Sequence, residues 1–295
     1  MRRLFVILKR TAVAFYDDQM TQHASALTYY ALMSLFPAAL LAISLLGLIG
    51  EYPTTYDAII GYLHKVAPDS AVVPLDSSLR TALQHKGTAA TTLVISVVLA
   101  LYGTTGVFES ARRAMNVIFK VSSGRRFLTR KAIDVASSVV LMVLGLATLV
   151  LIFVGGRFAD DLLGFIGIGG DGQRIWSLIR WPLAVAVAML AFAGIYYVTP
   201  DVRHRAFSFV LPGAIVAVLL WLGASFAFST YISSVADVGA LYGAFAGAIV
   251  LVAWLWLTNV ALLFGAELNA EIERQKELEA GVPHHETLEL PARRG

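Results

Sequence analysis

Six long apolar segments alternate along the chain with shorter stretches that hold nearly all of its charged residues. They cover residues 26–50, 88–108, 135–155, 182–199, 209–231 and 243–266. A helix rises about 1.5 Å per residue, so about 20 apolar residues cross a hydrocarbon core about 30 Å thick. All six segments are near that length. The pattern therefore predicts six membrane-spanning helices.

The order of residues within the apolar segments indicates helices rather than the strands of a β-barrel. Each segment is a continuous apolar run, whereas the strands of a membrane barrel alternate apolar and polar positions. Hydrophobic residues make up 58% of the chain and charged residues 15%, against about 45–50% and about 25% in soluble domains. We therefore expect an all-α membrane protein, with a transmembrane domain at 24–273 between a helix at 1–23 and a largely disordered tail at 274–295.

The placement of positive charge sets the expected orientation. If the N-terminus lies in the cytoplasm, seventeen of the 23 Lys and Arg residues fall in segments on that side. Loops that stay in the cytoplasm carry an excess of Lys and Arg, so we expect both termini to be cytoplasmic. A positive rim at the lipid surface also accounts for the basic balance of the chain. We therefore expect membrane lipids with anionic headgroups as partners, and no nucleic acid.

The first 23 residues have the pattern of an amphipathic helix. Apolar residues recur at helical spacing at Leu4, Leu8, Ala12 and Phe15. Basic residues stand among them at Arg2, Arg3, Lys9 and Arg10. A helix of this kind lies in the headgroup layer of an anionic membrane surface. We expect an interfacial helix here, and a solvated N-terminal arm is the alternative.

Three glycines near the start of the sixth span are spaced four residues apart, at Gly239, Gly243 and Gly247. Small residues at this spacing let two helix backbones approach closely inside a membrane. We interpret them as a helix-packing face. A contact within the chain is the favoured interpretation and a contact between subunits is the alternative, so both a monomer and an oligomer stay open.

Polar residues share one helical face at the end of the second span, at Glu109, Arg112, Arg113 and Asn116. Their spacing of three and four residues places them as neighbours on a helix surface. The simpler interpretation is a solvated helix end held by a Glu–Arg pair. The functional interpretation is a charged cytoplasmic gate or a site for a lipid phosphate, because Arg binds phosphate with two parallel hydrogen bonds.

The sixth span ends in Glu267 and Asn269. A helix C-terminus already carries partial negative charge, so a carboxylate there needs a basic partner. Arg112 or Arg113 lies at the same predicted level and would fit. Three tyrosines are expected above these charges, at Tyr29, Tyr30 and Tyr102. We interpret the set as the lining of a cytoplasmic mouth, although Tyr is also an ordinary residue of membrane interfaces.

The sequence lacks the residue patterns of the common catalytic and metal sites. There is no Cys, and the six His residues have no metal-ligand spacing with one another or with a carboxylate. We find no Gly-rich phosphate loop, serine nucleophile elbow or paired catalytic carboxylates. We therefore expect no metal, no cofactor and no enzymatic activity.

Several stretches resemble the YihY/virulence factor BrkB family of bacterial inner-membrane proteins. They include Ala24–Pro37, which resembles the first span of that family, and Leu263–Ala270, which is the most specific match. The resemblance extends from Asp17 to Ile272. Many members have a basic residue followed by Ile-Trp where this chain has Val117-Ile118-Phe119, so no basic role carries over to that position. The family implies six spans with both ends in the cytoplasm.

The resemblance and the residues together favour a protein of the inner (plasma) membrane that moves or handles a lipid or another amphiphile in building the cell envelope. A transporter or flippase-like protein would use the charged mouth as part of its path. A non-transporting envelope scaffold, in which the same residues are structural, is the runner-up. Some family members have carried a ribonuclease label, but hydrolysis of a phosphodiester needs held metal ions or a His pair, so a membrane ribonuclease is the least favoured function.

Overall fold

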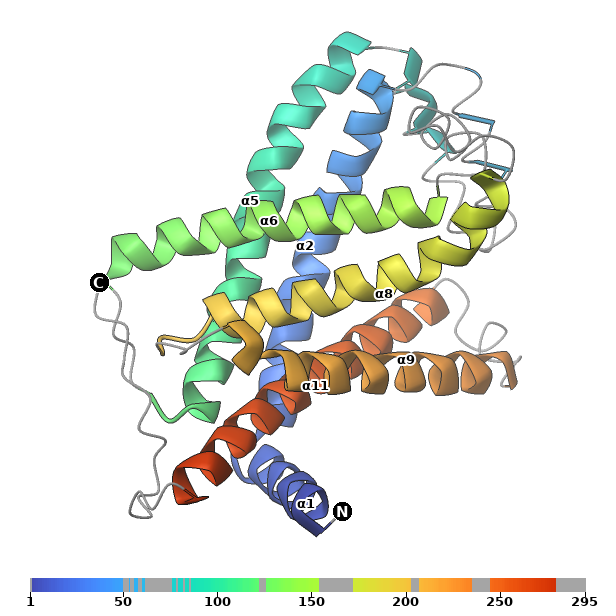
Figure 1. The fold of residues 1–295 in the computed structure, drawn as a ribbon. Helices are drawn as coiled ribbons and strands as arrows, with labels where there is room; N and C mark the ends of the chain where they lie inside the picture. Colours follow the sequence, from blue (N-terminus) through green and yellow to red (C-terminus); the bar gives the residue numbers. More distant parts are fainter. Residues whose placement is uncertain are drawn as a thin grey trace. The chain divides into compact units, whose positions relative to one another are not determined.

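Helices account for nearly all of the residues that the computed structural model describes, which are 2–49, 53, 56–57, 60–61, 76–77, 79–81, 83–84, 86–121, 126–153, 172–202, 207–234 and 245–279. The long ones are α1 (Arg2–Asp17), α2 (Met20–Ile49), α5 (Lys86–Ile118), α6 (Phe127–Phe153), α8 (Gly172–Val198), α9 (Leu211–Ser234) and α11 (Phe245–Glu279) (Figure 1). A short 3₁₀ helix, η1 (Phe207–Phe209), precedes α9. The expectation of a helical membrane protein is confirmed.

Five helices in the described part of the chain are long and apolar enough to cross a membrane. The qualifying stretches are Met20–Leu45, Thr91–Ile118, Leu178–Val198, Leu211–Ile232 and Gly247–Glu279. Only 6–28% of the residues in their most apolar windows are buried. Side chains so apolar and so exposed are suited to lipid rather than water. The predicted third span falls largely on α6, and the count of six spans and their orientation stay predictions.

The chain divides into two compact units. The first consists of Met1–Leu27, Phe108–Ser234 and Trp256–Gly295, and the second of Thr28–Val107 and Val235–Leu255. The boundary passes through the middle of three helices, because α2, α5 and α11 each contribute residues to both units. The first unit holds α1, α6, α8 and α9 complete, and it contains most of the charged residues that the sequence analysis selected.

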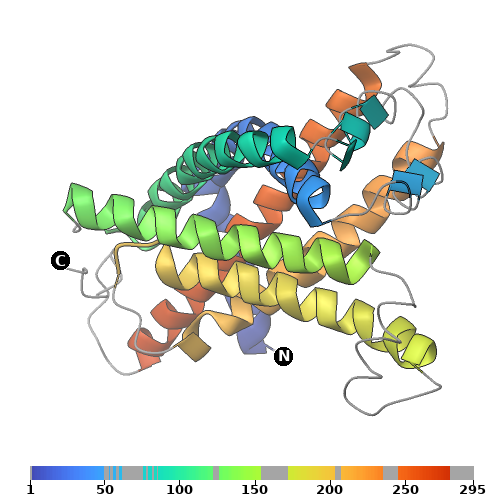
Figure 2. The same ribbon diagram turned by 90° about the horizontal axis from the view of Figure 1, so that it is seen from above.

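In the first unit, α8 packs against both α6 and α9. Figures 1 and 2 both show α6 and α8 running side by side. The centre of this packing is Tyr196 on α8, whose ring is fully buried and whose hydroxyl donates a hydrogen bond to the carbonyl of Leu262 at 2.6 Å. A buried tyrosine hydroxyl needs such a partner, so this bond fixes α8 against α11.

Two glycines allow α9 and α11 to approach each other at the same place. A Cβ built on Gly265 would lie 2.5 Å from the Tyr196 hydroxyl and 2.7 Å from the Cβ of Ala217, and would also collide with the carbonyl oxygen of Gly213. A Cβ on Gly213 would in turn collide with the carbonyl oxygen of Gly265. Only glycine fits at either position, because the backbones themselves are in contact.

Asn269 completes this contact by capping the first turn of α9. Its Oδ1 accepts a hydrogen bond from the backbone N–H of Gly213 at 2.8 Å, and its Nδ2 donates to the carbonyl of Val210 at 3.1 Å. The first N–H groups of a helix have no partner within the helix. A side chain from α11 therefore satisfies a helix end on α9, and Asn269 acts here as a structural residue. We call Tyr196, Gly213, Gly265 and Asn269 the neutral junction.

Two residues with a left-handed backbone conformation end α1 and α5. Gln19, with a φ of 54°, lies between α1 and α2, and Lys120, with a φ of 52°, follows α5. The N–H of Lys120 bonds to the carbonyl of Val117 at 3.1 Å, and that of Val121 to the carbonyl of Asn116 at 3.0 Å. These two hydrogen bonds form a Schellman motif, which satisfies the last carbonyl groups of a helix. The chain thus turns sharply at the end of α5 that belongs to the first unit.

In the second unit, α2 packs closely on α5 at two glycines. A Cβ on Gly103 would lie 3.0 Å from the backbone of Ser34, and one on Gly106 would lie 2.7 Å from the ring of Tyr30. The two threonines between them, Thr104 and Thr105, turn their hydroxyls back to carbonyls of their own helix, which satisfies them inside an apolar segment. Gly-Thr-Thr-Gly is therefore a packing motif.

The predicted glycine face of the sixth span does not make the expected contact where the structure describes it. Gly247 is exposed, and a Cβ there would meet no described atom within 4 Å. Gly239 and Gly243 lie outside the described residues. The predicted tail starts as a continuation of α11, which stays helical to Glu279, and residues 280–295 lie outside the described part.

Candidate functional site

The first unit brings together two helices that are far apart in the sequence, with α1 lying against the C-terminal half of α11. The rings of Phe15 and Phe264 are 5.9 Å apart, and the Nη1 of Arg10 donates a hydrogen bond to the Oε1 of Gln275 at 3.2 Å. These pairs show that the two helices run in opposite chain directions. On α1, Ile7 and Thr11 are buried. Helix α1 therefore packs one face on the protein and leaves the other exposed.

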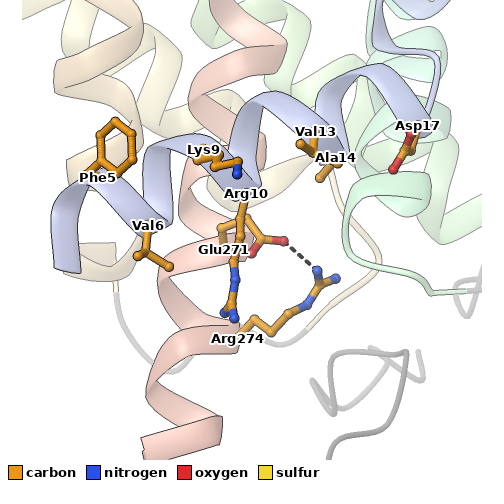
Figure 3. Close-up of a pocket in the computed structure, with 9 residues that line it drawn as sticks. All are labelled: Phe5, Val6, Lys9, Arg10, Val13, Ala14, Asp17, Glu271 and Arg274. Atoms are coloured by element: carbon orange, nitrogen blue, oxygen red, sulfur yellow. Dashed lines mark hydrogen bonds and ion pairs between the residues drawn. The ribbon is translucent and has the colours of Figure 1, made fainter. Parts of the chain in front are cut away.

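A groove of about 690 Å³ lies between α1 and α11 (Figure 3). Its apolar lining comes from α1, at Phe5, Val6, Val13 and Ala14. Its charged lining comes from both helices, at Lys9, Arg10, Asp17, Glu271 and Arg274. The groove thus places basic groups beside apolar groups, which is the arrangement that an anionic amphiphile requires.

One ion pair spans the floor of the groove. The Nη1 of Arg274 lies 2.5 Å from the Oε1 of Glu271, and Glu271 is 2% exposed. Figure 3 shows this pair below α1, with Arg10 extending toward the same region from above. A carboxylate so deeply buried needs a close cation, so Arg274 has a structural task as well as a place in the lining.

Arg112 joins α5 to α6 through a buried ion pair with Asp134. Both side chains are almost completely buried, at 4% and 6% exposed. The Nη2 of Arg112 donates to the Oδ1 of Asp134. We expected Arg112 or Arg113 to pair with Glu267. Arg112 pairs with Asp134 instead, from a helix that the sequence did not place beside it.

Arg113 and Glu109 form a separate pair on the surface of α5. The Nη2 of Arg113 lies 2.7 Å from the Oε1 of Glu109, and Lys131 on α6 lies 3.8 Å from the other oxygen. The side chain of Arg113 is 70% exposed. Exposed pairs of this kind contribute little to stability. The simpler interpretation of a Glu–Arg pair at a helix end therefore describes these two residues well.

Asn116, the last member of the predicted polar face, holds the segment after α8. Its Nδ2 donates to the Oδ2 of Asp201 at 3.1 Å, and its Oδ1 accepts from the backbone N–H of Asp201 at 3.0 Å. Asp201 is completely buried. The side chain of Asn116 thus bonds both the backbone and one carboxylate oxygen of a single buried residue, which joins α5 to the segment after α8.

Glu267 is buried, and the described part of the chain supplies no matching cation for it. It is 1% exposed, and its Oε1 has no hydrogen-bond partner among the residues that the structure describes. The charged groups that act on it through space are Asp18, Lys120, Glu271 and Arg274. Lys120 is paired with Asp18, and Arg274 is paired with Glu271. Three carboxylates therefore share two cations, and Glu267 is the carboxylate left over.

The three predicted tyrosines belong to the second unit. Tyr29 and Tyr30 make an edge-to-face ring contact at 5.4 Å, and the ring of Tyr30 covers Gly106. Tyr102 is 81% exposed. Tyr30 therefore has a packing role within its own unit, and the idea that the tyrosines share a mouth with the charges of the first unit stays a prediction.

The groove and the buried pairs include residues that we did not select from the sequence, at Lys9, Arg10, Asp17, Asp18, Lys120, Asp134, Asp201, Glu271 and Arg274. A signal existed for Asp134, because it is an acid one residue before a predicted span and close to the basic Arg130 and Lys131. No such signal existed for Asp201 or Asp18, whose partners depend on how distant segments fold. Within the described residues, no three His, Asp or Glu side chains lie close enough to hold a metal ion.

Comparison with known proteins gives a consistent result over nearly the whole chain. Residues 11–288 match the model of a family described as virulence factor BrkB. The ribonuclease-like protein YfkH of Bacillus subtilis is 28% identical over 265 residues, which cover 89% of this chain and 93% of that protein. A UPF0761 membrane protein of Pseudoalteromonas translucida is 26% identical over 261 residues, 86% of this chain and 81% of the relative.

A UPF0761 membrane protein of Xanthomonas oryzae is 25% identical over 266 residues. The match covers 88% of this chain but only 58% of the longer relative, so the chain spans little more than half of that protein. No solved structure matches the chain.

Proposed function

The chain belongs to the virulence factor BrkB family, and from that premise we propose that this multi-pass bacterial membrane protein moves or handles a lipid or another amphiphile. The proposal covers a transporter or flippase-like activity in the building of the cell envelope. It includes the two expectations that the first 23 residues lie in the lipid headgroup layer and that anionic lipids are the partners.

The observation that carries the proposal is Glu267, an ionisable side chain buried without a matching cation in a helix long enough to span the membrane. Ionisable groups at membrane depth are costly, and they commonly belong to substrate or proton paths. Asn269, two residues further along the same helix, differs from Glu267 because both of its polar side-chain atoms have partners.

An amphiphile fits the surroundings of Glu267 better than a bare ion does. Helix α1 exposes Phe5 and Tyr16, which are 70% and 81% exposed, beside the basic residues Lys9 and Arg10. Apolar side chains flanked by Lys and Arg are typical of helices that contact an anionic lipid surface. The same helix packs on α11 a few residues from Glu267.

The alternative of an envelope scaffold is supported by the pairs around Arg112 and Asn116. Both residues connect helices through buried hydrogen bonds, which is what a structural role requires. The two functions make different predictions for Glu267. A transporter would use this carboxyl group in lipid handling, whereas a scaffold would not.

Lipid exchange in reconstituted vesicles tests the proposal. Vesicles that contain a phospholipid with a fluorescent headgroup are treated with a reductant that destroys only the outer-leaflet dye. We expect vesicles with the wild-type protein to lose the protected half of the signal faster than vesicles without protein. Glu267→Gln should slow this loss by about tenfold or more, the equivalent of about 1.4 kcal/mol in the barrier, and the exposed Gln22→Ala should not. Equal rates with folded wild-type protein and with empty vesicles would favour the scaffold.

We also propose that the protein is not a ribonuclease. The support is the sequence, which lacks the paired His or the metal-holding carboxylates that phosphodiester hydrolysis uses. RNA should stay intact when it is incubated with purified protein. Cleavage that follows the protein through every purification step and is lost in a point variant would contradict this.

A further inference from the structure

We propose that the groove between α1 and α11 binds one phospholipid that carries an anionic phosphate headgroup. The inference rests on the proposed function, because it names the class of amphiphile and the place where it is held. The groove is formed by residues Phe5 to Asp17 of α1 and by Glu271 and Arg274 of α11 (Figure 3).

The charge of the groove favours a negatively charged group. Among its lining side chains, Arg274 and Glu271 neutralise each other in an ion pair. The remaining charges are two basic groups, on Lys9 and Arg10, and one acidic group, on Asp17 at the far end of α1. The groove therefore keeps a net positive charge near the middle of α1, where an anion is attracted.

Arg10 is already oriented for a ligand. Its Nη1 donates to the neutral amide oxygen of Gln275 on α11, so its position is held while its charge is not cancelled. A guanidinium fixed through one nitrogen still offers its other N–H groups, and Arg matches the geometry of phosphate oxygens well. Lys9, next along the helix, adds a second charge that needs no fixed geometry.

The apolar lining favours a ligand with an acyl chain. Val6 and Val13 lie two helical turns apart along α1, and Phe5 and Val13 are 70% and 52% exposed. Covering such surface is favourable by about 25 cal/mol for each Å² removed from water. A free phosphate would leave this surface exposed, and a fatty chain laid along the helix would cover it.

The position of the groove in the chain points to a membrane lipid. Helix α1 ends at Asp17, and α2, which is long and apolar enough to span a membrane, begins at Met20. The groove therefore lies within a few residues of the start of a predicted span. At a membrane boundary a phospholipid supplies both the phosphate and the apolar chain at high local concentration.

Binding of a short-chain phospholipid to the full-length protein in an uncharged detergent tests the inference. We would measure the Kd of dioctanoyl phosphatidate by titration calorimetry for the wild type, for the double variant Lys9→Gln/Arg10→Gln and for a matched control, Arg130→Gln/Lys131→Gln. The control removes the same two charges from adjacent positions on α6, away from the groove. We expect the Kd to rise about tenfold or more in the groove variant, as for the loss of hydrogen bonds to a charged group, and to stay within about twofold in the control. Val13→Asn should weaken binding without changing the charge.

Three comparison ligands show whether the affinity comes from the phosphate, from the acyl chains or from negative charge alone. Glycerol 3-phosphate has the phosphate without the chains, dioctanoylglycerol has the chains without the phosphate, and an acidic peptide has negative charge without either. Each should bind more weakly than the phosphatidate and should not distinguish the groove variant from the control. Equal loss in both double variants, or equal binding of any comparison ligand, would overturn the inference. Because binding is measured without a bilayer, the outcome does not depend on whether the protein moves lipids.

Discussion

Helix α11 presents two different polar faces between residues 262 and 274. Gly265 and Asn269 lie on one face, within the neutral junction, whereas Glu267, Glu271 and Arg274 lie roughly opposite, since two residues turn a helix by about 200°. Both polar atoms of the Asn269 side chain, Oδ1 and Nδ2, form hydrogen bonds with the start of α9. On the charged face, Glu267 and Glu271 each keep an oxygen without a hydrogen-bond partner among the described residues.

The difference teaches how one helix can serve two purposes. The neutral face holds its neighbours through backbone contact and short, uncharged hydrogen bonds, which tolerate little change. The charged face faces α1, the turn after α5 and the groove, and its charges do not balance. We therefore expect substitutions on the neutral face to change stability and substitutions on the charged face to change lipid handling.

The largest effect is expected at the glycine contact. Gly265→Ala should lower the free energy of unfolding by more than about 4 kcal/mol, because the new methyl group meets backbone that cannot move without separating α9 from α11. Thermal unfolding in detergent would measure this. Gly194→Ala on α8 is the matched control, because a Cβ there meets no described atom within 4 Å. Helix propensity alone should make that variant up to about 1 kcal/mol more stable. Similar behaviour of the two variants would disprove the close contact.

The next largest effect is expected from Arg112→Ala, which leaves Asp134 buried without a cation. Breaking a buried ion pair by removing one partner costs about 3–5 kcal/mol. The double variant Arg112→Ala/Asp134→Ala should regain part of that loss, since no charge is then stranded. Arg113→Ala, which removes an exposed pair, should cost less than about 1 kcal/mol. Equal losses from the two arginines would show that burial does not separate them.

A smaller loss is expected from Asn269→Ala, which removes the cap of α9 without leaving a charge. We expect a decrease of about 1–3 kcal/mol in the free energy of unfolding, since a buried N–H loses its acceptor. Hydrogen exchange should speed up at the first turn of α9 and not at its last. A uniform increase along α9 would mean that Asn269 does not act as a local cap.

The smallest change in stability is expected from Glu267→Gln. The amide has nearly the same shape as the carboxyl group and cannot ionise in its buried position, so the free energy of unfolding should rise or stay within about 1 kcal/mol. Lipid exchange should nevertheless slow, as proposed above. A loss of stability as large as that of Asn269→Ala would contradict the difference between the two faces, because Glu267 would then be a structural residue like Asn269.

The helical framework could be predicted from the sequence because lipid-length apolar runs have few other solutions. The positions at which the helices end were harder to predict. Helix α11 continues past its apolar run to Glu279, and Arg274–Glu271 and Lys276–Glu273 pairs one turn apart line this extension. Such pairs stabilise a helix in water, so polarity alone did not mark where the helix stops.

The partners of the charged residues could not be predicted in the same way. The spacing of Glu109, Arg112 and Arg113 fixed which residues share a face, but the partner of Arg112 depends on how α6 lies against α5. The close glycine contact was missed for a related reason. Gly213 and Gly265 are single glycines on different helices, so no regular spacing marks them. The four-residue spacing that we selected includes Gly247, which makes no close contact among the described residues.

The pairing of α1 with α11 has a consequence for how the protein is made. Arg10 and Gln275 are 265 positions apart, so α1 leaves the ribosome long before the part of α11 that it contacts. At about 5–20 residues per second that interval is roughly 15–50 s. During it, α1 lacks the contacts that Arg10 and Phe15 make with α11. A chain cut short before α11 would lack those contacts permanently, which would let proteolytic surveillance tell an unfinished copy from a finished one.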